Sequence, residues 1–152
     1  MPDRDYTHRA VVDKLGLQPG MAVRVVGVRA STAGARELLA DVAARTGRRP
    51  VTARTPADVV LYWPRTAAEI GPTLAALRGQ IHPAGGIWVI TAKRGWASAS
   101  GLAYFNQDQL IPLGAAARLV DNKVCSLSER ESAMRFVIRR DERPKTKAEG
   151  RP

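Results

Sequence analysis

The chain has 152 residues, enough for one domain with a buried core, and its hydrophobic content of 45% is ordinary for a globular protein. A formal charge of +10 favours an anionic partner, while a single cysteine, Cys125, excludes an internal disulfide and a cysteine-based metal site. No apolar run reaches the length of a membrane span and the N-terminus lacks signal-peptide features, so we expect a cytoplasmic protein with no membrane partner.

Three mostly apolar runs predict strands that are covered on both faces, as in a parallel sheet. They span residues 21–28, 58–63 and 87–92. The third run follows Gly85-Gly86 and changes abruptly to cations at Lys93, which is typical of a central strand that ends at a loop. We therefore expect residues 87–92 to lie at the centre of the sheet.

Helical patterns separate these runs. Apolar residues recur at helical spacing over 8–15, 35–46, 66–77 and 106–117. Thr66 and Glu69 fit a capping box, and Gly47 is a stop signal for the helix before it. Between the third strand and the last helix, residues 93–101 (KRGWASASG) are predicted to be a loop rich in small residues.

The C-terminal part differs in kind. Residues 119–127 and 133–139 read as two strands, and the connection between them is too short for a crossover helix. These strands are therefore predicted to pair antiparallel. We place one domain at residues 1–140 and expect a disordered basic tail at 141–152.

This order of elements predicts a mainly parallel, doubly wound α/β sheet with helices on both faces and a C-terminal antiparallel hairpin. Three phrases, Pro19-Gly20, Asp58–Leu61 and Pro83–Val89, resemble the first, fourth and fifth strands of methyltransferases of the Rossmann type. The segment 29–56 has room for one helix and one short strand, where a full methyltransferase fits two of each. The resemblance implies a truncated methyltransferase-like Rossmann fold.

Over most of its length the chain also resembles an uncharacterised bacterial family of short Rossmann-like proteins, known as a domain of unknown function. The resemblance runs from Tyr6 to Arg140 and rests on residues 6–9, 14–20, 86–93 and 119–125. Near the position of Glu131, relatives carry a tryptophan in the hairpin turn. The resemblance implies a fold and no activity.

The motifs of a methyltransferase are incomplete in this sequence. A site for S-adenosylmethionine needs a glycine-rich turn after the first strand and a carboxylate at the end of the second. Gly27 and Gly34 are too far apart for that turn, and Arg48–Arg54 contains no carboxylate. We therefore expect no S-adenosylmethionine and no methyl transfer, with a methyltransferase of degenerate motif as an alternative.

The predicted strand ends instead carry cations and indoles. Because the carboxyl ends of parallel strands meet at one edge of the sheet, we expect these side chains to line one crevice. The candidate ligand-binding residues are Arg29, Ser31, Thr32, Trp63, Arg65, Lys93, Arg94 and Trp96. They favour an anionic small ligand, a nucleotide or a phosphorylated metabolite.

Other interpretations stay open. The cations are equally compatible with a solvated surface, and the tryptophans with core packing. The charge also allows a module that binds nucleic acid or an acidic protein, and the fold allows a scaffold without catalysis. The sequence indicates no catalytic residue and no metal site: His8 and His82 stand alone, without the spacing of metal ligands.

Overall fold

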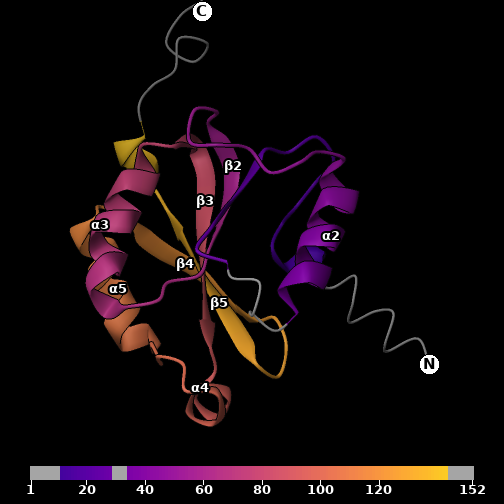
Figure 1. Ribbon diagram of the computed structural model, residues 1–152. Coiled ribbons are helices and arrows are strands. Elements are labelled where there is room, and N and C mark those ends of the chain that lie inside the picture. The colour runs from indigo at the N-terminus through magenta and orange to yellow at the C-terminus, as the bar shows by residue number, and fades with distance from the viewer. Residues whose placement is uncertain (1–10, 29–33, 144–152) are drawn as a thin grey trace, which may run out of the picture.

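The strands form one mixed sheet, as the sequence predicts. The computed structural model describes residues 11–28 and 34–143, and Figure 1 shows the sheet between two layers of helices. The strands are β1 (Val23–Val26), β2 (Ala57–Tyr62), β3 (Ile81–Ala92), β4 (Val120–Ser126) and β5 (Glu131–Val137). Their order is β1-β2-β3-β5-β4; β1, β2 and β3 are parallel, and β5 is antiparallel to both β3 and β4.

The helices also follow the predicted pattern, with two additions, at residues 94–100 and 140–142. They are α2 (Ala35–Thr46), α3 (Ala67–Arg78), α4 (Arg94–Ser100), α5 (Gln107–Ala116) and a short 3-10 helix, η1 (Arg140–Glu142). Residues 11–14 are helical, while the first part of the predicted helix 8–15 lies outside the described residues. Thr66 and Glu69 form the predicted capping box of α3. The sheet order and the helices on both faces confirm the fold class predicted from the sequence.

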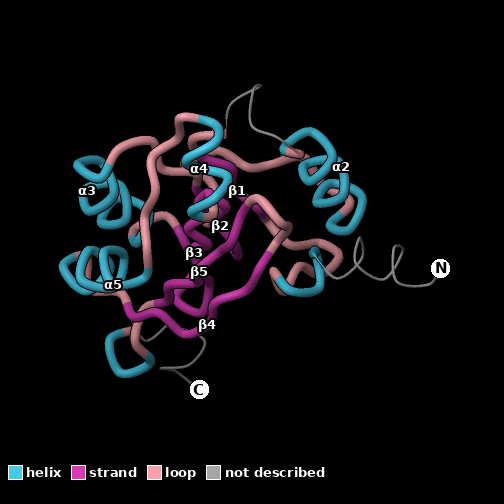
Figure 2. The backbone as a smooth tube through the Cα atoms, turned by 90° about the horizontal axis from the view of Figure 1, so that it is seen from below, coloured by secondary structure: helices cyan, strands magenta, loops and turns pink. Residues whose placement is uncertain are grey.

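Two cores cover the two faces of the sheet. On one face, Val60 and Tyr62 of β2 pack with α3 and α5; on the other, Val59 and Leu61 pack with α2 and the N-terminal segment. This alternation follows from the two-residue period of a strand. Figure 2 shows α2 on one side of the strands and α3 and α5 on the other.

The connections β1–α2–β2 and β2–α3–β3 step in the same direction along the sheet, but their helices lie on opposite faces. The two connections therefore have opposite hands, and one departs from the right-handed rule. The chain between α2 and β2 runs beside β1, where the Val51 N–H donates to the Val23 carbonyl over 2.8 Å. The short strand allowed for 48–54 does not form; this segment covers the edge of β1 instead.

The predicted loop at 93–101 is wrong, because residues 94–100 form α4. Only Ala97 of this helix is buried, so the segment shows no apolar periodicity. Gly101 ends the helix with a left-handed φ of 69°, a conformation that glycine adopts without strain. The additional helix covers the carboxyl end of β3.

The predicted boundary at residue 140 is close to the last described element. Glu142 of η1 lies 3.5 Å from Arg78 and 3.6 Å from Arg118, so this turn packs against the domain. The remainder of the expected tail, 144–152, is outside the described residues. Within 11–28 and 34–143, no helix has the length and apolarity needed to cross a membrane, and no group of metal-ligating side chains is found.

Helix α5 packs on the sheet through a glycine, which gives a testable stability effect. A Cβ at Gly114 would overlap the ring of Phe136, a side chain with 0% exposure. Gly114→Ala is therefore expected to lower the free energy of unfolding by about 3 kcal/mol through overpacking, measured by urea titration. Gly95→Ala is the control, because a Cβ there meets open space in α4 and should be neutral or stabilising by up to about 1 kcal/mol. Equal results for both variants would contradict this account.

Candidate functional site

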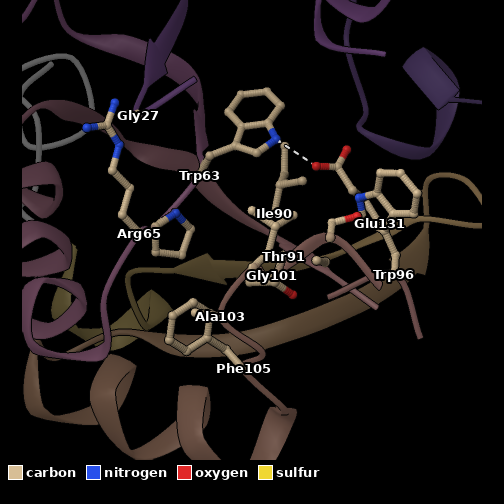
Figure 3. A pocket seen from close by; sticks show the side chains of 14 residues that line it. Gly27, Trp63, Arg65, Ile90, Thr91, Trp96, Gly101, Ala103, Phe105 and Glu131 are labelled. Carbon is tan, nitrogen blue, oxygen red and sulfur yellow. Dashed lines mark hydrogen bonds between the residues drawn. The ribbon is translucent and has the colours of Figure 1, made fainter. Parts of the chain in front are cut away.

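A pocket of about 380 Å³ lies at the carboxyl ends of β1, β2 and β3. Its position follows from the topology, since the helices that come after β1 and β2, α2 and α3, lie on opposite faces of the sheet. Helix α4, the loop after it and the start of β5 complete the walls (Figure 3). The described residues that line it are Gly27, Trp63, Pro64, Arg65, Ile90, Thr91, Ala92, Trp96, Ser100, Gly101, Leu102, Ala103, Phe105 and Glu131.

Gly27 allows β1 and β2 to approach closely at the edge of this pocket. Its φ is 82°, and a Cβ would overlap the carbonyl oxygen of Trp63. The Trp63 N–H donates to the Val26 carbonyl over 2.9 Å, which continues the pairing of β1 with β2 beyond the last ladder residue. No side chain fits between these two strand ends, so the position requires glycine.

A half-buried carboxyl group and an indole form the polar contact of the pocket. Trp63 Nε1 donates to Glu131 Oε2 over 3.1 Å, from the end of β2 to the start of β5 (Figure 3). Burial raises the pKa of Glu131, while the Trp63 hydrogen bond and the charge of Arg130 act in the opposite direction. Among the described residues that line the pocket, Glu131 is the one carboxylate, and its Oε1 accepts no hydrogen bond from another described residue.

A second indole joins α4 to the hairpin. The guanidinium of Arg130 stacks over the ring of Trp96, with 4.7 Å between its carbon and the ring centroid. The Lys93 N–H donates to the Arg130 carbonyl over 2.7 Å, which fixes the hairpin turn beside the start of α4. These contacts hold the half-buried ring of Trp96 at the pocket wall, where a flat ligand can stack against it.

A second pocket of about 140 Å³ adjoins the first and shares Thr91, Ala92 and Phe105 with it. Lys93 and Arg94 line this neighbour. Lys93 Nζ donates to Ser126 Oγ over 2.6 Å, and the Arg94 guanidinium lies over the Tyr104 ring at 5.2 Å.

The structure separates the predicted site residues into three groups. Trp63, Arg65 and Trp96 line the larger pocket, whereas Lys93 and Arg94 line its neighbour. Arg29, Ser31 and Thr32 lie outside the described residues. Of the three predicted cations among the described residues, Arg65 is therefore the one that lines the larger pocket.

Sequence reasoning missed Glu131, Phe105 and the wall made by residues 100–103. The predicted hairpin pairs β4 with β5, but the place of Glu131 depends on β5 lying beside β3, which no pattern in the sequence indicates. The register pairs Glu131 with Ala92. Phe105 follows α4, a helix that the sequence does not predict because residues 93–101 are mostly small. The sequence therefore contains no indication that Phe105 lines the pocket.

Comparison with known proteins gives neighbours in structure. No protein-family model matches the chain, and no curated protein matches its sequence. The chain is similar to mitomycin 7-O-methyltransferase MmcR, with a TM-score of 0.57 and 13% identity over 87% of this chain and 52% of that one. This chain thus spans about half the length of MmcR.

Two further methyltransferases are matched over more of their own length. Magnesium protoporphyrin IX methyltransferase ChlM from Synechocystis PCC 6803, with bound S-adenosylmethionine, gives a TM-score of 0.55 at 11% identity, covering 88% of this chain and 77% of that one. N-methyltransferase NodS from Bradyrhizobium japonicum WM9 gives 0.53 at 11% identity, covering 89% and 96%. These likenesses establish a methyltransferase-like Rossmann fold.

Two expectations from the sequence need correction. We expected an anionic small ligand at a basic crevice and no methyl transfer, and we did not expect S-adenosylmethionine. The three matched proteins named above are methyltransferases, one of them with that cofactor bound, which overturns both expectations. The physical reason is that the cations do not converge: Lys93 and Arg94 turn to the neighbouring pocket, and aromatic and small residues dominate the larger one. The resemblance to the uncharacterised bacterial family stays a prediction.

Proposed function

We propose that the protein is an S-adenosylmethionine-dependent methyltransferase that binds its cofactor in the strand-end pocket. The observation that carries the proposal is the coincidence of a methyltransferase-like fold with a pocket at the carboxyl ends of β1, β2 and β3. Open α/β sheets bind their ligands at this place. The volume of about 380 Å³ is within the range of small-molecule sites, about 300–1,000 Å³.

The residues present fit an adenosyl group. Its two main demands are a flat apolar surface for the base and an acceptor for the ribose hydroxyls. Trp63, Trp96 and Phe105 supply aromatic surface, and Glu131 supplies carboxylate oxygens. Glu131 comes from β5, whereas the family pattern places its acid at the end of a strand that this chain lacks. In this proposal Glu131 takes over that role.

The chain's own residues have distinct tasks in this site. S-adenosylmethionine, when bound, supplies an electrophilic methyl group on a cationic sulfur. The electron-rich indole faces of Trp63 and Trp96 attract a cation, and the half-buried carboxylate of Glu131 adds negative charge. Gly27 keeps the ends of β1 and β2 close together, so that the backbone wall of the pocket has a fixed shape.

Calorimetric titration with S-adenosylmethionine and with S-adenosylhomocysteine tests the proposal. We expect saturable binding, weakened about tenfold by Trp96→Ala through loss of a stacking surface, with no change in Arg54→Gln, an exposed cation in the segment that covers β1. Transfer of a labelled methyl group to the RNA, protein or small-molecule fraction of a cell extract then tests activity. Absence of heat with either compound, for protein whose circular dichroism shows it folded, would refute the proposal.

A further inference from the structure

One ladder pair and three hydrogen bonds link four cations near β4 and β5, which we call the cation track: Arg135, Lys123, Lys14 and Lys93. Lys123 stands opposite Arg135 in the β4–β5 ladder. Lys123 Nζ donates to the Lys14 carbonyl over 3.4 Å, and Lys14 Nζ donates to the Ser126 carbonyl over 2.9 Å. Lys93 Nζ reaches the hydroxyl of the same serine over 2.6 Å. The track thus ends at the second pocket.

The track costs stability in the isolated protein. Like charges directly opposite each other in an antiparallel ladder are destabilising. Within the described part of the chain, none of the four cations makes an ion pair with a carboxylate. Arg135 is half-buried against the backbone of Gly86; burial lowers its pKa, and the charge of Arg143 lowers it further. An anionic partner would relieve this repulsion.

Three of the four track cations line a groove of about 460 Å³, and Lys93 alone lies at the second pocket. Lys14, Lys123, Arg135 and His82 line it, and Trp88 forms part of its wall. The carboxylate among its described lining residues, Asp58, is already engaged: Oδ2 accepts the Ala22 N–H over 2.8 Å, and Oδ1 lies 3.9 Å from His82 Nε2. The groove therefore presents an excess of positive charge to solvent.

We propose that the cation track binds the phosphodiester backbone of a single-stranded nucleic acid, which is the substrate class of the strand-end site. This inference rests on the proposed methyltransferase function. The track runs from the groove to the second pocket, and that pocket shares three residues with the larger one. Tyr104 at the second pocket is 37% exposed and carries the Arg94 guanidinium, a surface on which a base can stack. Spaced cations beside aromatic rings are the common means of holding a single strand.

Fluorescence anisotropy with a labelled 20-nucleotide RNA, and with DNA of the same sequence, tests the inference without cofactor. The variant Lys14→Gln/Lys123→Gln removes two track charges, and Arg49→Gln/Arg54→Gln removes two exposed charges at the opposite edge of the sheet. We expect the track variant to raise Kd about tenfold or more and to lower the slope of log Kd against log salt by about 1.4, at about 0.7 per lost contact. The control should change Kd less than threefold.

Two results would overturn the inference: equal increases in Kd for the two double variants, or no binding of either RNA or DNA at about 50 mM salt. A lower Kd for RNA than for DNA, or the reverse, supports the inference and indicates which of the two is the methyl acceptor. Calorimetry separates this inference from the proposed function, because the track variant should bind S-adenosylmethionine as the wild type does. Strand binding by a protein that shows no calorimetric binding of S-adenosylmethionine would leave the track inference standing and would refute the proposed methyltransferase.

Discussion

Glu131→Gln is expected to raise the free energy of unfolding at pH 7 and to weaken the binding of S-adenosylmethionine at least tenfold. The carboxylate is half-buried, and burial disfavours its charged form. Glutamine keeps an oxygen that can accept the Trp63 Nε1–H but carries no charge, so the desolvation cost disappears. Loss of a charge-assisted acceptor for the ribose lowers affinity by about 1.5 kcal/mol or more. A gain in stability with a loss in binding is typical of functional groups.

The stability of the wild-type protein should depend on pH with a definite sign. Because burial raises the pKa of Glu131 in the folded state, the folded protein holds this proton more tightly than the unfolded chain. The contribution of Glu131 to the free energy of unfolding is therefore largest below the ordinary value of 4.5 and is lost as the pH rises through the raised pKa. Urea titrations of wild type and Glu131→Gln across this window should converge at low pH and separate above it.

Glu129→Gln is the matched control for both measurements. Glu129 lies two positions away in the hairpin turn, is exposed, and loses the same charge. We expect it to change neither stability nor cofactor affinity by more than about 0.5 kcal/mol. If Glu131→Gln bound S-adenosylmethionine like the wild type, Glu131 would have no part in holding the cofactor.

The sequence contained enough to predict the sheet, because burial on both faces leaves a direct trace in composition. The β2 prediction of 58–63 differs from the observed 57–62 by one residue at each end. The start of β3 was missed, since Ile81–Gly86 includes a proline, two glycines and two exposed positions that break the apolar run. Its pairing with β2 is also irregular there, with a register shift between Ala57 and Val59.

The site was harder to predict because it depends on where side chains point and on which strands pair, and hydrophobic periodicity specifies neither. The position of Lys93 at the end of β3 was correct, but its long side chain turns to Ser126 of β4 and away from the larger pocket. Glu131 reaches the pocket only through the β3–β5 register. Hydrophobic patterns locate strand ends; the residues that meet there depend on which strands become neighbours.

Gly27→Ala is expected to lower the free energy of unfolding by about 3 kcal/mol and to abolish cofactor binding. Two costs add. A left-handed φ of 82° disfavours any residue with a Cβ by about 1 kcal/mol, and the new methyl group would overlap the backbone carbonyl of Trp63, which cannot rotate away. Separation of β1 from β2 would relieve the overlap, but it would also move the part of the pocket wall that Trp63 and Arg65 form.

Comparison with Gly20→Ala isolates the second cost, the overlap of the new methyl group with the Trp63 carbonyl. Gly20 has a similar φ of 86°, but a Cβ there meets open space, so alanine should cost only the backbone term of about 1 kcal/mol. The difference between the two variants in urea titration measures the collision with Trp63. If both lose the same stability while Gly27→Ala still binds S-adenosylmethionine, the close approach of β1 and β2 does not shape the site. A larger loss in Gly27→Ala, together with lost binding, would mean that the strand ends themselves form the wall of the cofactor pocket.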